Sequence, residues 1–382
     1  MSSAPGSSNG STPTRRLRPV SSGLPDFPWD TIADAKAAAA AHPGGIVDLS
    51  VGTPVDPVDP LIRKALAASS EFPGYPATVG TRELRESAVG ALSRRFGITG
   101  LDESSILPVV GTKEVIAGLP AQIGVPAGDL VVIPEVAYPT YEVGALLAGA
   151  QVLRADSVDA IGDREPALIY LNSPSNPTGR VQSAAELKVI VDWARERGAV
   201  VVSDECYLGL TWEGSAHSVL HSDVCGGDHS GLIAVHSLSK VSNLASYRAG
   251  FLAGDRELIA ELLAVRKHAG MIVPFPIQGA TVAALNDDAH VDVQRERYRV
   301  RRDKLRTALL GAGFAIDHSE AGLYLWATRG EDSRTTQRWL AERGILVAPG
   351  DFYGPAGARH VRIALTGTDE RIDAAVERLV RI

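Results

Sequence analysis

The chain has 382 residues, 45% of them hydrophobic and 22% charged, which is ordinary for a globular protein with a sizeable core. Its net charge of −7 argues against a protein that binds nucleic acid or anionic membranes non-specifically. No apolar run approaches the ~20 residues that a membrane helix needs. Two cysteines provide neither a disulfide framework nor a Cys-rich metal site, which fits a reducing cytoplasm. We therefore expect small-molecule partners and no metal.

Four parts of the chain are predicted from its local composition. Residues 1–25, rich in Ser, Gly, Pro and Arg, are expected to form a disordered leader. Residues 26–45 contain Phe27 and Trp29 ahead of an Ala-rich helix, and are predicted to be an arm and helix of a smaller domain. Residues 46–285 are assigned to a large domain, and residues 286–382 to a small C-terminal domain.

Three loops in the first third of the chain carry candidate ligand contacts. Gly52 follows an expected strand at 46–50 and would let the backbone approach a ligand, although a simple turn also explains a glycine. Tyr75 lies in an irregular loop, where it either packs or reaches a ligand. An expected strand at 106–110 leads through a glycine into a helix that begins at Thr112 and Lys113. Backbone N–H groups at such a helix start can bind an anion.

Short apolar runs alternate with amphipathic stretches in the centre of the chain. A capping box at Ser183 and Glu186 opens a helix between two of these runs. The alternation predicts an α/β fold with a mostly parallel sheet covered by helices on both faces. The predicted strands are residues 130–133, 167–171, 199–202 and 232–235.

Candidate side chains follow three of these strands, where open α/β sheets place their chemistry. Tyr138 can lay its ring against a planar ligand, or can be a core tyrosine. Asn176 stands in a double-proline loop, where its amide can donate to an anionic oxygen. Asp204, shortly before Tyr207, is an acid at a buried strand end, which is costly unless a cation partners it.

The stretch after the fourth strand is the strongest candidate for a covalent ligand site. Lys240 follows Ser237 and precedes Arg248 in one loop. A lysine there can form a Schiff base with an aldehyde while the arginine holds a phosphate of the same molecule. Pyridoxal 5′-phosphate (PLP) needs both groups. Most lysines are solvated surface groups, so contacts from the rest of the chain decide between the two interpretations.

The C-terminal residues predict a smaller α+β unit. Arg362 is the charged member of an apolar strand at 360–365. A structural ion pair would explain it, and so would a bidentate grip on a substrate carboxylate. The other expected elements are a charged helix at 298–310, strands at 314–317 and 323–326, a helix at 335–342, an apolar run at 345–350 and a final helix.

Taken together, these motifs resemble those of the class I/II aminotransferases, which are PLP enzymes of fold type I. All of them occur in the family's order along the chain from about Phe27 to Ile382. The matching stretches are residues 172–179 (NSPSNPTG), 204–207 (DECY), 237–240 (SLSK) with Arg248, and 361–364 (VRIA). The resemblance implies a fold type I PLP-dependent transferase whose large domain, 46–285, binds the cofactor.

The resemblance also implies a role for each candidate residue. Lys240 would form the Schiff base, Asp204 would partner the pyridine nitrogen and Tyr207 would assist them, with Arg362 on the substrate α-carboxylate. The remaining implied contacts are Tyr207 and Asn176 on the ring hydroxyl, Tyr138 on the ring face, Ser237, Arg248 and the Thr112 and Lys113 backbone on the phosphate, Gly52 and Asn176 at the substrate, and Tyr75 on the phosphate in the neighbouring subunit of a homodimer.

Three further stretches are similar to the actinobacterial succinyldiaminopimelate aminotransferases. They are residues 48–54 (DLSVGTP), 74–78 (GYPAT) and 242–251 (SNLASYRAGF). This similarity implies amino transfer between N-succinyl-L,L-diaminopimelate and 2-oxoglutarate in cytoplasmic lysine biosynthesis. An aspartate or aromatic aminotransferase, a PLP-dependent C–S lyase and a DNA-binding regulator are the alternatives. The regulator is disfavoured, because a leader of about 25 residues is too short for a helix-turn-helix module.

Overall fold

The computed structural model describes residues 20–380. Most of the predicted leader, residues 1–19, therefore lies outside the described residues. The part of the leader that is described begins with one turn of 3-10 helix, η1 (Val20–Gly23). The arm that follows forms a second such turn, η2 (Pro28–Ile32), and runs directly into helix α1 (Ala33–Ala40).

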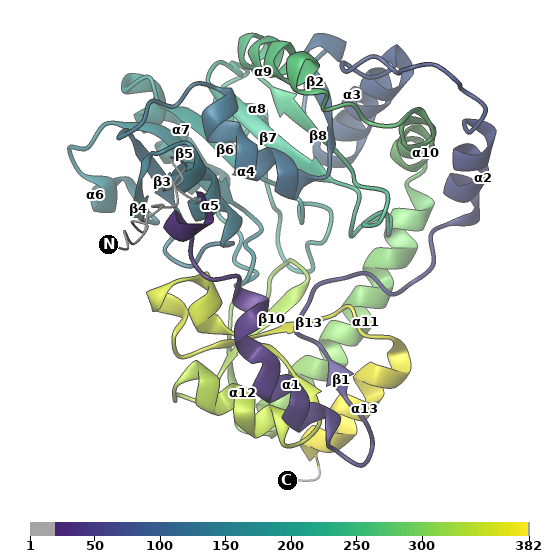
Figure 1. Cartoon of the computed structure of the whole chain (residues 1–382), viewed down its shortest axis with the longest axis vertical. Helices are drawn as coiled ribbons and strands as arrows, with labels where there is room; N and C mark the ends of the chain where they lie inside the picture. Colours follow the sequence, from purple (N-terminus) through teal and green to yellow (C-terminus); the bar gives the residue numbers. More distant parts are fainter. Residues whose placement is uncertain (1–19, 381–382) are drawn as a thin grey trace, which may run out of the picture.

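A seven-stranded sheet forms the centre of the larger part of the molecule (Figure 1). Every neighbouring pair in it is parallel except the two that involve β8, so the predicted mostly parallel sheet is confirmed. Strands β4 and β8 were not expected from the sequence. In spatial order the strands are β2 (Ile106–Val110), β8 (Ala249–Gly254), β7 (Leu232–Ser237), β6 (Val200–Asp204), β5 (Pro166–Asn172), β3 (Leu130–Ile133) and β4 (Gln151–Arg154).

Helices cover both faces of this sheet, because alternate strand residues point to opposite sides and both sets are apolar. In β6, for example, Val201 packs in the core on one face and Val202 in the core on the other. The first face is covered by α2 (Pro60–Ala68), α3 (Arg82–Phe96), α6 (Val158–Ile161), α7 (Ala184–Glu196), α8 (Ser222–Cys225) and α10 (Phe275–Asn286); the second by α4 (Thr112–Gln122), α5 (Thr140–Leu147) and α9 (Arg256–Ala269).

The predicted capping box of α7 is present. The Ser183 side chain accepts a hydrogen bond from the backbone N–H of Glu186, whose carboxylate accepts one from the backbone N–H of Ser183. Both interactions satisfy N–H groups that a helix start leaves without partners. The local sequence thus fixes where this helix begins.

A four-stranded antiparallel sheet organises the C-terminal part of the chain, the lower half in Figure 1. The charged helix expected at 298–310 is longer than predicted and extends from the larger part into the smaller one. The strands, in spatial order, and the helices are β12 (Ala348–Pro349), β13 (Val361–Ala364), β10 (Tyr324–Thr328) and β9 (Ala315–Asp317), with α11 (Ala289–Gly311), α12 (Ser333–Ala341) and α13 (Asp369–Val380).

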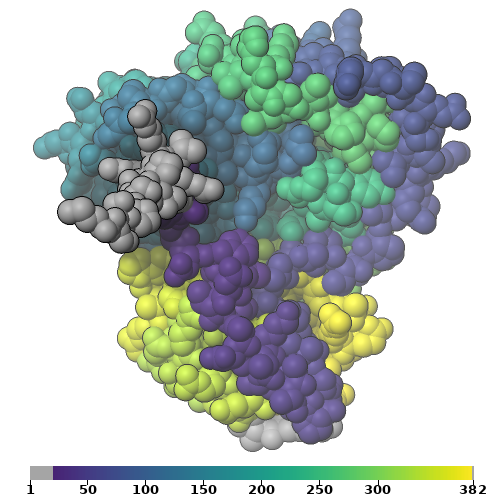
Figure 2. All heavy atoms as spheres, viewed as in Figure 1, coloured from purple at the N-terminus to yellow at the C-terminus, as the bar shows by residue number. Residues whose placement is uncertain are grey.

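Residues from the two ends of the chain build the smaller part together. Strand β1 (Val47–Asp48) is shorter than the expected strand at 46–50 and pairs in parallel with β11 (Ile345–Leu346). The smaller part therefore includes residues 47 and 48, which the sequence analysis assigned to the larger domain. The local sequence could not indicate this pairing, because the partner strand lies almost 300 residues away along the chain. Helix α1 packs against α12 in the same region, and Figure 2 shows this N-terminal segment lying over the C-terminal part.

The division into two domains near residue 285 otherwise stays a proposal, with α11 as the link. Among residues 20–380, no helix combines the length and the apolar character that crossing a membrane requires.

Candidate active site

A cavity of about 380 Å³ lies between the ends of the central strands and the C-terminal part. With the exception of Tyr75, every residue that the sequence singled out lines it. These residues are Gly52, Thr112, Lys113, Tyr138, Asn176, Asp204, Tyr207, Ser237, Lys240, Arg248 and Arg362. Their convergence follows from the parallel sheet, which brings the carboxyl ends of β5, β6 and β7 to the same edge.

Lys240 stands in the turn that follows β7, and its Nζ donates to the backbone oxygen of Gly52. Burial lowers the pKa of Lys240, since an ammonium group loses solvation there, and the nearby positive charges of Arg362 and Arg248 act in the same direction. A Cβ at Gly52 would lie 2.1 Å from the hydroxyl of Tyr324. The glycine is therefore required for the close approach of this backbone, and the turn interpretation alone does not account for it.

Asp204 ends β6 and is buried. Its Oδ2 accepts from the Tyr141 hydroxyl at 2.8 Å, and its Oδ1 accepts from the backbone N–H of Cys206 at 3.2 Å. Burial raises the pKa of Asp204, although both hydrogen bonds favour the ionised form. Within residues 20–380 no cationic side chain pairs with this carboxyl, which leaves it suited to a cationic group of a ligand.

Tyr207 and Tyr324 meet across the cavity, with their hydroxyl oxygens 3.2 Å apart. Burial and the neighbouring Tyr324 hydroxyl raise the pKa of Tyr207. Burial opposes ionisation of Tyr324 as well, but the positive charge of Arg362 acts in the opposite direction, and the Tyr324 pKa is lowered. One of the two neighbouring hydroxyls can therefore donate to an anionic ligand in the cavity.

A small concave wall forms where β2 leads into α4. Gly111 has φ +77, and a Cβ there would lie 2.0 Å from Nη2 of Arg248. Arg248 also has a left-handed φ of 57 and donates from Nη1 to the Ala245 backbone oxygen at 2.9 Å. The start of α4 at Thr112, the arginine and Ser237 thus face one space, which suits an anion.

Arg362 lies on β13 and is only 3% exposed. It donates from Nη1 to Oδ1 of Asn176 at 3.0 Å and from Nη2 to the backbone oxygen of Ser50 at 2.7 Å. Its Nε is buried and has no hydrogen-bond partner among the described residues. The structural ion pair considered for this arginine is not formed in the described chain, and its free N–H favours the carboxylate-binding interpretation.

Tyr138 packs its ring at 82° to Tyr141, with 5.6 Å between the ring centroids, and still lines the cavity. Burial raises the pKa of Tyr138 to about 12, so its hydroxyl stays neutral. Asn176 is buried and held by its backbone N–H, which donates to Oδ1 of Asn172 at 2.7 Å. The Asn176 side chain is held by the hydrogen bond that its Oδ1 accepts from Arg362, and the Tyr138 ring by its contact with Tyr141.

Tyr75 does not join the cavity. Its side chain is 96% exposed in the single chain. The implied contact with a neighbouring subunit stays a prediction.

Sequence reasoning missed several cavity residues, notably Tyr324, Tyr353 and Cys206. Tyr324 lies within the strand expected at 323–326 and Tyr353 follows the apolar run at 345–350, and neither stretch indicates a ligand contact. Cys206 appeared only as part of the 204–207 stretch. Trp29 was noted as part of an arm, and the structure places it in the wall of the cavity. The Pro-rich aromatic segment 27–29 was the one available signal.

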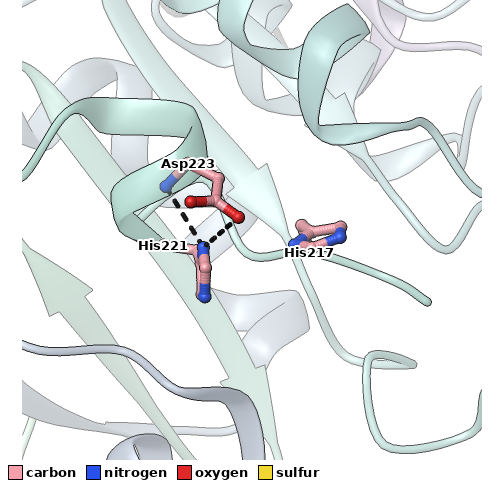
Figure 3. Close-up of side chains that lie close together, drawn as sticks. All are labelled: His217, His221 and Asp223. Atoms are coloured by element: carbon pink, nitrogen blue, oxygen red, sulfur yellow. Dashed lines mark hydrogen bonds and ion pairs between the residues drawn. The ribbon is translucent and has the colours of Figure 1, made fainter.

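A separate cluster of His217, His221 and Asp223 lies outside this cavity (Figure 3). The Nδ1 atom of His221 accepts a hydrogen bond from the backbone N–H of Asp223 at 3.2 Å and caps the short helix α8. This contact accounts for the position of His221 without a ligand, so the cluster contributes nothing to the cavity chemistry.

Comparison with known proteins relates the whole chain to aminotransferases. A "Probable aminotransferase" of Mycobacterium tuberculosis is 68% identical over 360 residues, which is 94% of this chain and 86% of the relative. A 4-dedimethylamino-4-oxo-anhydrotetracycline transaminase of Streptomyces rimosus is 58% identical, covering 93% of this chain and 99% of the relative. A solved structure of a "probable N-succinyldiaminopimelate aminotransferase" of Thermus thermophilus is 30% identical with a TM-score of 0.84, covering 93% of this chain and all of that one.

The family model "Aminotransferase class I and II" matches residues 45–379. Proteins of this family and of fold type I use pyridoxal phosphate. The cavity fits that cofactor, because three features suited to it face one space. They are the buried carboxyl of Asp204, which no cation among the described residues pairs, the anion-suited wall of Thr112 and Arg248, and Lys240, whose pKa is lowered by burial. The chain therefore belongs to the class I and II aminotransferases.

Proposed function

We propose that Lys240 carries the PLP of this aminotransferase and that the enzyme exchanges an amino group between N-succinyl-L,L-diaminopimelate and 2-oxoglutarate. The observation that carries the first part is the single cavity in which Lys240, Asp204 and Arg362 converge from three distant stretches of the chain. A site for a covalent aldehyde cofactor needs a lysine, a partner for the ring nitrogen and an anchor for the substrate, and all three face the same space.

The cofactor, when bound, withdraws electrons from the substrate so that the proton on its α-carbon becomes acidic. The side chains of the chain then have separate tasks. Asp204 keeps its negative charge against the protonated ring nitrogen, and Tyr141 orients that carboxylate. Arg248, Ser237 and the start of α4 at Thr112 hold the phosphate.

The proton transfer itself is assigned to Lys240. Once the substrate amine has displaced it from the cofactor, Lys240 would be a free amine, and its burial favours the neutral form. A neutral amine could accept the proton from the substrate α-carbon. Arg362 fixes the α-carboxylate during this step, so the carbon stays within reach of Nζ. Tyr207 and Asn176 would donate hydrogen bonds to the hydroxyl oxygen on the pyridine ring of the cofactor.

The substrate assignment is supported by a second cation in the cavity. Nζ of Lys113 lies 5.4 Å from the ring centroid of Phe27, and Lys113 forms no salt bridge with any residue of the described chain. Arg362 is expected to bind the α-carboxylate, so an unpaired Lys113 favours substrates with a further carboxylate. Beyond the α-carboxylate, 2-oxoglutarate has one further carboxylate and N-succinyl-L,L-diaminopimelate has two. The name of the Thermus thermophilus relative agrees with this choice.

A second candidate is amino transfer to a bulky cyclic ketone. The relative named as a 4-dedimethylamino-4-oxo-anhydrotetracycline transaminase is 58% identical, well above the 30% of the Thermus thermophilus protein. Three aromatic side chains in the cavity wall, Trp29, Tyr324 and Tyr353, offer ring faces to such a molecule. The aspartate, aromatic and C–S lyase alternatives have no comparable support.

The same proposal includes a homodimer in the cytoplasm. The exposed Tyr75 supports the dimer, since an aromatic side chain that is almost fully exposed suits an interface. The two cysteines of the described chain are both free, which supports a reducing compartment.

The test is the visible absorbance of the PLP-loaded protein before and after addition of N-succinyl-L,L-diaminopimelate without an oxo acid. We expect the yellow colour to fade stoichiometrically as pyridoxamine phosphate forms, and 2-oxoglutarate to restore it. A yellow protein that ignores this donor but accepts another would leave the role of Lys240 standing and remove the lysine-pathway substrate. Lys240→Ala is the control, because it should lack both the yellow colour and turnover.

A further inference from the structure

We propose that Gln294 is a positioning residue for Lys240. The side-chain amide of this residue joins the two chain segments whose members, Lys240 and Gly52, meet in the cavity. The inference deepens the proposed function, and it rests on the proposed role of Lys240 as the cofactor lysine.

The contacts of Gln294 are buried and point in two directions. Gln294 lies on α11 and is 2% exposed. Its Oε1 accepts from Nδ2 of Asn243 at 2.9 Å, and its Nε2 donates to Oδ2 of Asp56 at 2.8 Å. Asn243 belongs to the turn that carries Lys240, and Asp56 to the segment that follows Gly52. The Gln294 side chain therefore bonds both segments that form the contact in the cavity: the turn with Lys240, the donor, and the segment after Gly52, the acceptor.

The orientation of the amide is determined by Asp56. Arg301 donates to both carboxylate oxygens of Asp56 at 2.7 Å. Burial opposes ionisation of Asp56, but the hydrogen bonds from Arg301 and Gln294 outweigh it and lower the Asp56 pKa. An ionised carboxylate only accepts, so the Gln294 nitrogen must face Asp56 and its oxygen must face Asn243. A side chain without this polarity cannot replace it.

A second hydrogen bond also connects the turn that carries Lys240 to α11. Nε2 of His290, also on α11, lies 2.8 Å from the Ser242 hydroxyl, and Nδ1 of His290 lies 2.7 Å from Oδ2 of Asp287. Ser242 thus anchors the same turn to the same helix. The first turn after Lys240 is attached to α11 at two successive residues, Ser242 and Asn243.

The backbone of the turn explains why such anchoring is needed. Asn243 has φ +57, a left-handed conformation that costs a non-glycine residue free energy. The hydrogen bonds that its side chain donates to Gln294 and to the Pro57 backbone oxygen offset that cost and keep the turn in one conformation. Without them the turn can relax, and Nζ of Lys240 moves with it. Because α11 also packs on α13, the position of Lys240 depends on the C-terminal part as well.

The test compares three variants. Gln294→Leu keeps a similar size and removes all three hydrogen bonds of the amide, those with Asn243, Asp56 and Arg297. Asn243→Gly removes the hydrogen bonds from the lysine turn to Gln294 and to the Pro57 backbone oxygen but leaves the contact between Gln294 and Asp56. Glycine also tolerates the left-handed φ, so this variant keeps the fold even if Gln294→Leu does not. Val293→Ala is the matched control, because Val293 is the preceding residue on α11 and is 53% exposed.

Two measurements do not depend on turnover. One is the rate at which added PLP attaches to the cofactor-free protein, followed by visible absorbance. The other is the pH midpoint for acetylation of Lys240 in the cofactor-free protein, read by mass spectrometry of its peptide. For Gln294→Leu and Asn243→Gly we expect attachment to slow about tenfold or more, since small misplacements of a reacting group cost at least that much. The midpoint should rise toward the ~10.4 of a free lysine, and Val293→Ala should match the natural protein.

Thermal unfolding of the same proteins separates positioning from stability. If both variants lower Tm but keep the natural attachment rate and acetylation midpoint, Gln294 is only structural and the inference is overturned. Borohydride reduction of the natural protein with PLP identifies a failure of another kind. If the cofactor is then found on a residue other than Lys240, the proposed function itself fails. If it is found on Lys240, the proposed role of that lysine stands, and the comparison of variants alone decides whether Gln294 positions it.

Discussion

Arg362 donates a hydrogen bond to the side chain of Asn176 at 3.0 Å, although 186 residues separate them. One residue comes from the C-terminal sheet and the other from a loop at the edge of the central sheet. The bond uses only Nη1, a second bond to Ser50 uses Nη2, and Nε remains free. The guanidinium is thus held in place from two sides, and its Nε–H, which has no partner among the described residues, can donate to a ligand.

Replacement of Arg362 by leucine should weaken both half-reactions, because the amino donor and the oxo acid each carry an α-carboxylate. We expect kcat/KM to fall about 100-fold for both, the factor that corresponds to roughly 3 kcal/mol for hydrogen bonds to a charged group. Steady-state kinetics with each substrate varied in turn measures this. Arg359→Leu, at an exposed arginine near the same strand, is the control. An equal loss in both variants would contradict the assignment.

Asp204→Asn should retain PLP but lose most of its turnover. The asparagine keeps the size of the carboxyl and can still accept from Tyr141, but it lacks the charge that stabilises a protonated ring nitrogen. Removal of such an electrostatic contact costs on the order of 100- to 1,000-fold in kcat. Single-turnover absorbance with a saturating donor checks this, with the bound cofactor quantified first. Turnover near that of the natural protein would mean that another group supports the ring nitrogen.

The buried acid Glu205 predicts a pH dependence of stability. Burial raises its pKa to about 7, even though Val219 donates a backbone hydrogen bond to it. The folded protein therefore holds a proton that the unfolded chain releases near its ordinary pKa of 4.5, so this group's contribution to stability falls as the pH rises from about 4.5 to 7. His236, 3.6 Å away, acts in the opposite sense: burial lowers its pKa to about 3, so its contribution falls as the pH drops below 6.5.

Glu205→Gln should remove the loss of stability between about pH 4.5 and 7 and leave the pH dependence that comes from His236. At pH 8 we expect the variant to be more stable by on the order of 3 kcal/mol, the free energy that corresponds to the shift of the Glu205 pKa. Urea unfolding of the cofactor-free protein between pH 5 and 8 measures the curve. A variant whose stability still declines over that interval would show that another group is responsible.

Tyr75 offers a test of the dimer by complementation. If Tyr75 reaches the phosphate in the neighbouring subunit, Tyr75→Phe should weaken PLP binding about tenfold, the factor for one hydrogen bond to a charged group. In a mixture of Tyr75→Phe and Lys240→Ala subunits, a mixed dimer has one site with both residues intact. Tight PLP binding and activity should then appear in the mixture. Failure of the mixture, with dimers verified by sedimentation, would place Tyr75 outside the site.

The central part of the fold and most of the cavity were predictable, because their signals are local. Lys240 and Asp204 each follow an apolar run of strand length, and the rule that parallel strands present their carboxyl ends to one edge brings them together. Strand β8 was missed because four of the six residues of AGFLAG are Ala or Gly, which have a weak strand preference. Strand β4 is a short edge strand whose residues are exposed or half-buried, so its sequence lacks a clear apolar pattern.

The residues that were missed depend on contacts between distant segments. Tyr324 enters the cavity because β10 pairs with β13, which sets its ring 3.9 Å from the guanidinium carbon of Arg362. Gln294 and Asp56 likewise meet only after α11 crosses between the two parts. Neither relationship leaves a pattern in a single stretch of sequence.

The pairing of β1 with β11 has a consequence for how the protein is made. Residues 47 and 48 leave the ribosome early, but their partner strand at 345 and 346 is synthesised almost at the end. Helix α1 must also wait for α12. The central sheet can be complete while the N-terminal segment is still exposed, so the last residues to be synthesised close the structure around the first. A truncation of the C-terminus would leave both ends of the chain open to proteases, and a fragment that begins after residue 285 would lack a strand of its own fold.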